Sequence, residues 1–305
     1  MRERLSLNVS VARSCFVKCL GCYNHFGSTP NLTSTENILS FLSAAKKRGY
    51  SKITLCGGDP LSRPDIIELL REIKKLGFFI VLDTVGTPIL GEASTIFYGR
   101  SLVKKINEAD IAKYVDIVGI PLEGPSNEII ALFRTERTHQ LDEQILILKK
   151  LSTVKANICI NTVVHKGNID HIEKLSFIVS DIRGIKKWQL FQFMPIGPLG
   201  YKNRNMYEVN DEDFFSLKDN ITKKYKEEFL KNVSIEFKAK AERKGNYMFV
   251  DSEGLAWVPS ITMDEKWDAQ KDTTHKRIII GNVNDLKDHE KILDKALNPQ
   301  IIKIE

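Results

Sequence analysis

Short apolar runs alternate with amphipathic stretches through the first two-thirds of this 305-residue chain. Short apolar runs predict buried strands, and stretches with apolar residues at helical spacing predict the helices that cover them. Six such strand–helix units follow one another in about 195 residues, a pattern that favours a parallel sheet. We expect an α/β fold, a partial TIM-like (β/α)6 barrel, with strands over 5–11, 53–55, 78–82, 115–120, 157–164 and 188–194.

Helices are expected between these strands. Thr33–Glu36 is a capping-box signature that predicts the start of the first helix, and Gly49 predicts its end. The other helices are expected over 65–76, 101–114, on both sides of 135–140, and over 169–182.

The sequence pattern of the chain changes after Pro195. The stretch Ile196–Gly200, which is rich in glycine and proline, indicates a domain boundary. We therefore expect a barrel core over 1–195 and a small α+β carboxyl-terminal extension over 196–305 that closes the barrel and shapes a substrate pocket. In the extension we expect a charged helix over 211–231, strands over 233–238, 247–251 and 255–259, and a last helix over 288–296.

Composition narrows the class of protein. Hydrophobic residues make up 42% of the chain, enough for one large core, and no run of about 18 apolar residues is present, which argues against a membrane span. The amino terminus leads directly into a strand with no apolar signal region, so we expect a cytoplasmic protein. The excess of 45 Lys and Arg over 39 Asp and Glu is modest and interspersed, as in 223–228. This distribution favours solvated helix faces over a nucleic-acid-binding surface. A weak attraction for an anionic substrate is compatible with it.

Three cysteines follow the first strand with the spacing C-x3-C-x2-C, at Cys15, Cys19 and Cys22. Thiolates are the ligands of iron–sulfur clusters, and the usual complement is four. The other two cysteines, Cys56 and Cys159, are distant in sequence. The triplet therefore predicts a cluster with one iron that no protein side chain ligates.

A structural zinc site is the alternative on spacing alone. Cys19 and Cys22 form a common zinc pair, and His25 is the one nearby candidate for a further ligand.

A second motif follows the second strand. Cys56-Gly57-Gly58-Asp59-Pro60 is similar to the Gly-Gly-Glu-Pro motif of the radical S-adenosylmethionine enzymes, and the C-x3-C-x2-C loop resembles the signature of that superfamily. The resemblance implies a [4Fe–4S] cluster on the three clustered cysteines, with S-adenosylmethionine chelating the open iron. It also implies the partial barrel.

The resemblance assigns cofactor binding to Gly57, Gly58, Asp59 and Pro60. The glycines would bring backbone groups close to the methionine moiety, because no side chain blocks the approach. Asp59 is one methylene shorter than the usual Glu, which shortens its reach to the amino group, and Pro60 keeps the rigid exit. Taken alone, the same four residues are typical of an ordinary strand-to-helix turn.

Five further residues are assigned to the cofactor. Tyr23 follows the third cysteine and is either an adenine neighbour or a core residue. Arg134 is either a bidentate partner of the cofactor carboxylate or a surface arginine. Asn161 is either a ribose contact or a loop cap, Thr84 resembles the threonine of the Thr-Asn-Gly turn of the family, and Met194 closes the sixth strand at the barrel mouth.

The carboxyl-terminal segment resembles a cysteine-free remnant of the extension that binds auxiliary iron–sulfur clusters in peptide-modifying relatives, on 247–254 and 281–283. No cysteine follows Cys159, so we expect a single cluster.

The resemblance implies reductive cleavage of S-adenosylmethionine and hydrogen abstraction from a small-molecule or peptide substrate, with an electron donor such as flavodoxin or ferredoxin. The reaction class, for example oxidoreductase, lyase or epimerase, and the catalytic residue stay open. The form of residues 19–24 resembles activases of glycyl-radical enzymes, which is one alternative. A non-enzymatic iron–sulfur or zinc module is the other.

Overall fold

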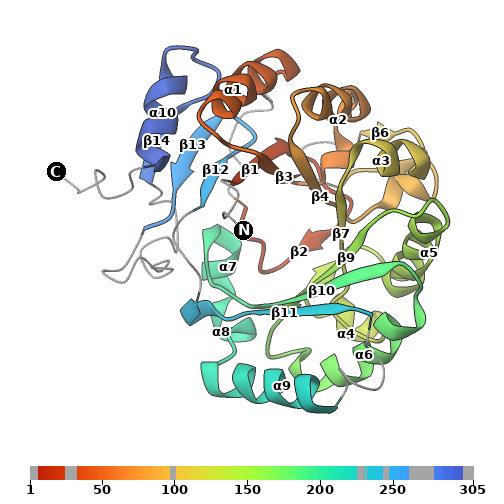
Figure 1. Ribbon diagram of the computed structural model, residues 1–305. Helices are drawn as coiled ribbons and strands as arrows, with labels where there is room; N and C mark the ends of the chain where they lie inside the picture. The colour runs from red at the N-terminus through yellow and green to blue at the C-terminus, as the bar shows by residue number, and fades with distance from the viewer. Residues whose placement is uncertain are drawn as a thin grey trace.

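A computed structural model describes residues 6–24, 33–96, 101–224, 230, 232–242, 247–260 and 278–297. In this part of the chain a ten-stranded sheet has the order β11-β10-β9-β7-β4-β3-β1-β12-β13-β14. The sheet curves, and most helices lie on its outer side (Figure 1). None of the helices in the described ranges is long and apolar enough to cross a membrane.

The six predicted strands form the centre of this sheet in chain order, and each pairs in parallel with the next. The prediction of a partial α/β barrel is confirmed. The strands are β1 (Ser6–Ala12), β3 (Lys52–Gly57), β4 (Phe79–Asp83), β7 (Ile117–Pro121), β9 (Ile158–Val164) and β10 (Ile185–Gln192).

The helices between these strands bury one apolar stripe each against the sheet. The first begins after Ser34, whose hydroxyl accepts from the amide of Asn37, and Gly49 follows its end with φ of +90°. The helices are α1 (Thr35–Lys47), α2 (Ile66–Lys75), α3 (Glu108–Tyr114), α4 (Asn127–Ala131), α5 (Gln140–Thr153) and α6 (Ile172–Asp181), with short 3-10 turns at Pro60–Ser62, Thr87–Ile89, Ile169–His171 and Lys240–Glu242.

The helix predicted over 101–114 is wrong in its first half. There, β6 (Leu102–Val103) pairs with β5 (Ala93–Ser94), and α3 begins only at Glu108. Asn107 determines this start, because its side chain accepts from the amide of Ala109 and satisfies a free donor of the first turn.

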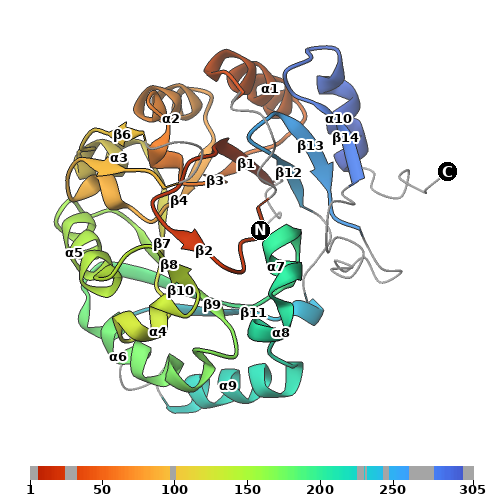
Figure 2. The same cartoon turned by 180° about the vertical axis from the view of Figure 1, so that it is seen from behind.

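The carboxyl-terminal extension adds strands to both edges of the central sheet. β11 (Ser234–Lys238) pairs in parallel with β10, and β12 (Met248–Val250) pairs in parallel with β1. The antiparallel strands β13 (Leu255–Val258) and β14 (Ile278–Asn282) continue the second edge. The helices of the extension, seen from behind in Figure 2, are α7 (Gly197–Lys202), α8 (Arg204–Tyr207), α9 (Asp211–Lys224) and α10 (Asp288–Leu297).

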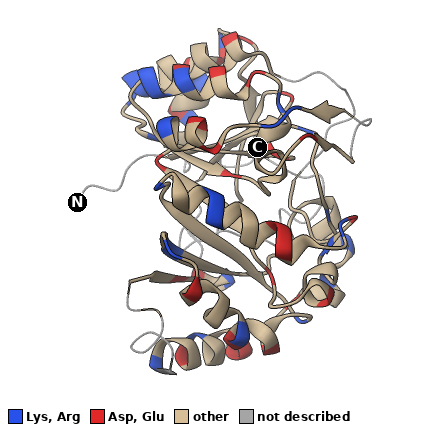
Figure 3. Ribbon diagram, turned by 90° about the vertical axis from the view of Figure 1, so that its right-hand side faces the viewer, with Lys and Arg blue, Asp and Glu red and all other residues tan. Residues whose placement is uncertain are grey.

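The predicted strands and the last helix of the extension are confirmed within one or two residues. The charged helix expected over 211–231 is present as α9, and residues 225–229 and 231 lie outside the described ranges. Charges of both signs are distributed along the outer helices, as the sequence indicated (Figure 3).

The inner face of the sheet, defined as the side turned away from the helices, is partly exposed. Along the central strands, fully buried residues that pack on the helices alternate with half-buried residues that face inward. Closed TIM barrels fill this space with Val, Ile and Leu, whereas here several inward residues are charged or polar. The half-buried inward residues include Ser6, Asn8, Lys52, Thr54, Phe79, Val81, Asp83, Ile117, Asn161, Val163, Lys187, Gln189 and Phe191.

Candidate cofactor site

The two sequence motifs meet at the carboxyl ends of β1 and β3. The amide of Gly58 donates to the carbonyl of Ala12 over 2.8 Å, and the amide of Asp59 donates to the carbonyl of Ser14 over 2.7 Å. A Cβ on Gly58 would lie 2.2 Å from the carbonyl oxygen of Ser14, and Gly57 has φ of +131°. The glycines therefore let the second motif pack on the cysteine loop. Their contact with the methionine moiety stays a prediction.

Asp59 joins the ends of β3 and β4. Its Oδ1 accepts from the hydroxyl of Thr84 at 2.6 Å and from the amide of Leu61 at 2.9 Å, and its Oδ2 accepts from the amide of Val85 at 2.7 Å. The Thr84 hydroxyl in turn accepts from the amide of Gly86 at 2.9 Å. Burial raises the pKa of Asp59, and these hydrogen bonds oppose the rise.

Both carboxylate oxygens of Asp59 are thus used by the chain itself. The structure brings together two residues that the sequence assigned separately, Asp59 and Thr84, and gives both a positioning role in the loop after β4. Pro60 opens the 3-10 turn Pro60–Ser62, in which Asp59 is the N-cap. Direct contacts of these residues with the cofactor remain predictions.

The cysteine loop is held against the far side of the barrel mouth. β2 (Lys18–Cys19) pairs with β8 (Arg134–Thr135), and the amide of Leu20 donates to the carbonyl of Phe133 over 2.9 Å. Gly21 lies against aromatic rings, since a Cβ there would be 2.5 Å from the ring of Phe133 and 2.6 Å from that of Phe193. A glycine is required at this position for the loop to pack.

Arg134 links the cysteine loop to a buried acid. Its Nε and Nη2 pair with the two carboxylate oxygens of Glu123, at 2.5 and 2.8 Å, and its Nη1 lies 3.0 Å from the Sγ of Cys19. The Glu123 side chain is 1% exposed and that of Arg134 13%, so Arg134 is no surface arginine. Its partners here are Glu123 and Cys19, and a contact with the cofactor carboxylate remains a prediction.

The three thiols of the triplet share one environment. Burial raises the pKa of each, to about 12 for Cys22, and the negative charge of Cys19 adds to the rise at Cys15 and at Cys22. Arg134 opposes the rise at Cys19 and Cys22. A coordinated thiol is deprotonated by the charge of the metal, so this buried donor set fits a cluster whose irons supply that charge.

The zinc alternative depends on a residue that the structure does not describe. His25 lies in the gap between 24 and 33. Among the described residues, no group of three or more His, Cys, Asp or Glu side chains is arranged to hold a metal ion.

Two other predicted residues lie on the inner side of the sheet. Tyr23 is 40% exposed as a residue, so it is not a core residue, and its hydroxyl hydrogen-bonds to the thiol of Cys56. The amide of Asn161 donates to the Oδ1 of Asp83 at 3.0 Å, and its oxygen accepts from the thiol of Cys159 at 3.5 Å. The expected adenine and ribose contacts remain predictions.

Met194 belongs to a different neighbourhood. It is 9% exposed and forms a small apolar cluster with Ile196, Phe249 and Trp257, in which the rings of Phe249 and Trp257 stack with centroids 4.4 Å apart. This cluster packs the end of the sixth barrel strand against the extension. None of the apolar partners of Met194 in this cluster is a residue of the cysteine loop.

Two site residues were missed by sequence reasoning. Glu123 lies just after the fourth barrel strand, β7, and its pairing with Arg134 could have been sought from the need to neutralise a buried charge. Asp83 directly precedes Thr84 and shares the strand parity of Phe79 and Val81, which was the signal that it faces inward.

A partial α/β barrel with three clustered thiols at the carboxyl ends of its strands defines the class of iron–sulfur barrel enzymes. The chain belongs to the radical SAM superfamily: the profile of this family, described as "Radical SAM superfamily", matches residues 9–176, more than half of the chain. Members of the superfamily use a [4Fe–4S] cluster and S-adenosylmethionine. The predictions of family, fold and cofactors are confirmed.

Curated relatives include proteins with different activities. The chain is 27% identical over 189 residues to the AdoMet-dependent heme synthase of Oleidesulfovibrio alaskensis, covering 61% of this chain and 45% of the relative. It is 26% identical over 226 residues to the probable GTP 3',8-cyclase of Saccharolobus solfataricus, covering 72% and 68%. A probable GTP 3',8-cyclase of Pyrococcus horikoshii matches at 27% identity over 60% of this chain and 55% of its own length. The chain thus spans about half the length of the first of these relatives.

Solved structures confirm the fold over nearly the whole chain. Streptococcus suis SuiB bound to the precursor peptide SuiA aligns with a TM-score of 0.70 and 17% identity over 99% of this chain and 67% of that one. Native anSMEcpe with bound AdoMet aligns with a TM-score of 0.67 and 18% identity over 98% of this chain and 82% of that one. At these identities the likeness concerns the fold alone.

Proposed function

We propose that this chain holds one [4Fe–4S] cluster through Cys15, Cys19 and Cys22, binds S-adenosylmethionine at the open iron, and abstracts hydrogen from a small-molecule or peptide substrate. The observation that carries the proposal is the joining of the two motifs by the hydrogen bonds from Gly58 and Asp59 to the cysteine loop. When bound, the cofactor pair supplies a carbon radical able to attack an unactivated C–H bond.

The residues of the chain fix and shield the site. Arg134 places a positive charge beside Cys19, which favours the thiolate form that ligates iron. Asp59 and Thr84 hold the loop after β4 next to the cysteine loop, and Val85 of that loop packs with Cys15. This apolar packing limits the access of water to the site.

We assign cofactor contacts to Gly57, Gly58, Asp59, Pro60 and Thr84 at the ends of β3 and β4. The other residues to which we assign cofactor contacts are Tyr23, Arg134, Asn161 and Met194. Residues 1–195 are the core of the proposed enzyme, and 196–305 shape its substrate pocket. The packing of Met194 and Ile196 on Phe249 and Trp257 supports a structural role for this extension. A cytoplasmic flavodoxin or ferredoxin is the proposed electron donor.

Anaerobic reconstitution with iron and sulfide tests this function. The protein should gain the visible absorbance of a [4Fe–4S] cluster, and with S-adenosylmethionine and a reductant it should form 5'-deoxyadenosine. Alanine at Cys15, Cys19 or Cys22 should remove the absorbance and the product, whereas Cys56→Ala and Cys159→Ala should keep the absorbance. A colourless protein that makes no 5'-deoxyadenosine would contradict the proposal and favour a zinc module. Formation of a glycyl radical on an added partner protein would favour an activase.

A further inference from the structure

The inner face carries two charges of opposite sign that are not paired with each other. Asp83 lies at the carboxyl end of β4 and Lys52 at the amino end of β3, and both point inward by strand parity. Within the described residues, neither side chain makes an ion pair within 4.0 Å. Their charges nevertheless influence each other, because each affects the pKa of the other.

Asp83 is held in place across a neighbouring strand. Its Oδ1 accepts from the amide of Asn161 on β9, and Gly119 of the intervening strand β7 lies between them. A Cβ on Gly119 would be 2.0 Å from the Oδ1 of Asp83 and 2.6 Å from the Nδ2 of Asn161. Because residue 119 has no side chain, there is room for this hydrogen bond. The hydrogen bond fixes the position of one carboxylate oxygen of Asp83.

Two further lysines of this region share a single carboxylate, so these three groups together keep a net positive charge. Glu236 on β11 pairs with Lys187 at 2.5 Å and with Lys238 at 2.9 Å, and accepts from Gln189 at 2.8 Å. Burial opposes these contacts, yet together they lower the pKa of Glu236 to about 2. Lys187 and Lys238 are therefore both paired with Glu236. Of the charged residues named here, Lys52 and Asp83 are the two that have no ion-pair partner in the described part of the chain and can pair with a ligand.

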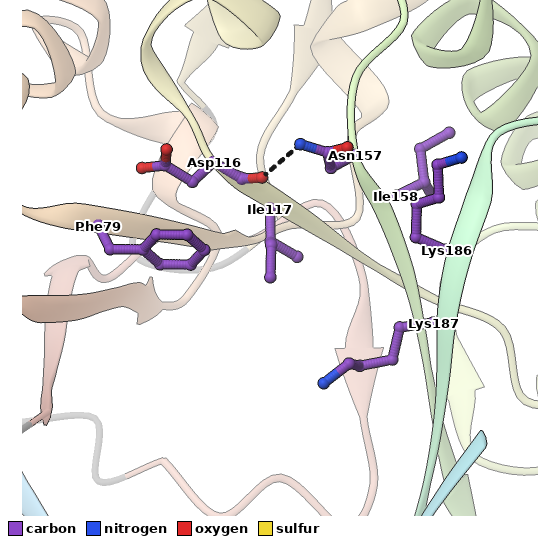
Figure 4. Close-up of a pocket in the computed structure, with 7 residues that line it drawn as sticks. All are labelled: Phe79, Asp116, Ile117, Asn157, Ile158, Lys186 and Lys187. Carbon is purple, nitrogen blue, oxygen red and sulfur yellow. Dashed lines mark hydrogen bonds between the residues drawn. The ribbon is translucent and has the colours of Figure 1, made fainter. Parts of the chain in front are cut away.

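A cavity lies at the amino ends of the strands, and Lys52 is not among the residues that line it. It is open to one side and has a volume of about 280 Å³, and Phe79, Ile117 and Lys187 point into it from three strands (Figure 4). Lys52 pairs in register with Phe79 on the neighbouring strand. Asp83 lies four residues further along the same strand as Phe79, about 13 Å at the usual rise, and a lysine side chain spans part of that distance.

We propose that the inner face binds a zwitterionic substrate of the amino-acid type, with Asp83 receiving its ammonium group and Lys52 its carboxylate. One fixed anion and one cation that form no ion pair with each other are complementary to a ligand with one charge of each sign. A phosphate-rich ligand fits less well, because two of the three inner lysines are already paired with Glu236.

This inference rests on the proposed function for its role in catalysis, but binding can be measured without turnover. The probes are L-leucine, L-lysine and L-phenylalanine, each free, as the N-acetyl derivative and as the methyl ester. S-adenosylmethionine carries the same pair of charges, so the reconstituted protein is first saturated with it. Saturation-transfer NMR, recorded before and after this saturation, reports which probes bind.

At least one free amino acid should bind, and blocking its ammonium or its carboxylate should weaken binding about tenfold or more. Asp83→Asn keeps the hydrogen bond from Asn161 and should lose the preference for a free ammonium group. Lys52→Gln should bind the free acid and the methyl ester equally. The matched surface variants Asp170→Asn and Lys47→Gln, both at exposed positions, should behave as the wild-type protein.

The inference is overturned if no free amino acid binds, if the blocked derivatives bind as well as the free ones, or if saturation with S-adenosylmethionine abolishes binding. If Asp83→Asn does not fold, the ester comparison in Lys52→Gln decides the question. Formation of 5'-deoxyadenosine without probe binding rejects this inference alone, whereas binding without 5'-deoxyadenosine rejects the proposed function alone.

Discussion

The Nη1 of Arg134 lies 3.0 Å from the Sγ of Cys19, while the rest of the same guanidinium forms a bidentate pair with the buried Glu123. One cation therefore serves a buried carboxylate and a predicted cluster ligand at once. The antiparallel pairing of Cys19 with Arg134 in β2 and β8 fixes this geometry from the backbone.

Replacing Arg134 with Met should destabilise the protein strongly, because Glu123 would be left as a buried charge without a partner. The expected loss is about 3–5 kcal/mol in the free energy of unfolding. The double variant Arg134→Met with Glu123→Met should recover most of this loss, since no buried charge remains. Urea unfolding of the three proteins measures the difference. A double variant as unstable as the single one would contradict the role assigned to the pair.

Thr84 supplies a hydroxyl to the buried carboxylate of Asp59. Thr84→Val should remove the 2.6 Å hydrogen bond and leave one lone pair of Asp59 unsatisfied, at a cost of about 1–3 kcal/mol. Thr84→Ser keeps the hydroxyl and is the matched control, with a smaller loss. Thermal unfolding compares the two variants. Equal melting temperatures would show that the hydroxyl contributes nothing to holding the loop after β4.

The barrel core could be predicted from the sequence because its strand and helix periodicities are local. The contacts that build the site are not local. Asp59 and Thr84 belong to different strand–helix units. Glu123 and Arg134 likewise belong to a different unit from Cys19. No short-range sequence pattern predicts such contacts. The same holds for the extension: the strand character of 247–251 is visible in its residues, but its pairing with β1, at the other end of the chain, is not.

The helix expected over 101–114 shows a second limit. Apolar spacing continues through that segment, and only the cap at Asn107 distinguishes the helix from the preceding strand. The inward direction of Asp83 could be predicted from strand parity, but its contact with Asn161 could not. The role of Asp83 depends on Gly119, whose missing side chain matters only once β7 lies between β4 and β9.

Gly58 is required for the contact between the two motifs. Gly58→Ala would place a Cβ 2.2 Å from the backbone oxygen of Ser14, so the cysteine loop must shift. We expect at least a severalfold loss of bound iron after reconstitution. Gly91→Ala is the matched control, since no atom lies within 4 Å of a Cβ at that position. Iron content and visible absorbance are the measurements. A Gly58→Ala protein with full cluster absorbance would show that the loop tolerates the displacement.

The buried carboxylate of Asp83 should make stability depend on pH between about 4 and 6. Burial raises the pKa of Asp83 to about 6, although Asn161 and Lys52 oppose the rise. A raised pKa in the folded state means that the native protein binds the proton more tightly than the unfolded chain, so stability falls as pH rises through this window.

Asp83→Asn removes the titrating group and keeps the hydrogen bond from Asn161. The other groups that face Asp83 are Lys52, whose charge lowers the pKa of Asp83, and Tyr23, Cys56 and Cys159, whose pKa values the charge of Asp83 raises. The cysteines and the tyrosine have raised pKa values, so they stay neutral in this window. The stability of Asp83→Asn relative to the wild-type protein should therefore increase between pH 4 and 7, on the order of 1 kcal/mol after allowance for partial exposure. Thermal unfolding at several pH values measures this difference, with Asp170→Asn as the control that should show none. A constant difference across the window would mean that Asp83 titrates near its ordinary pKa and is better solvated than its surroundings indicate.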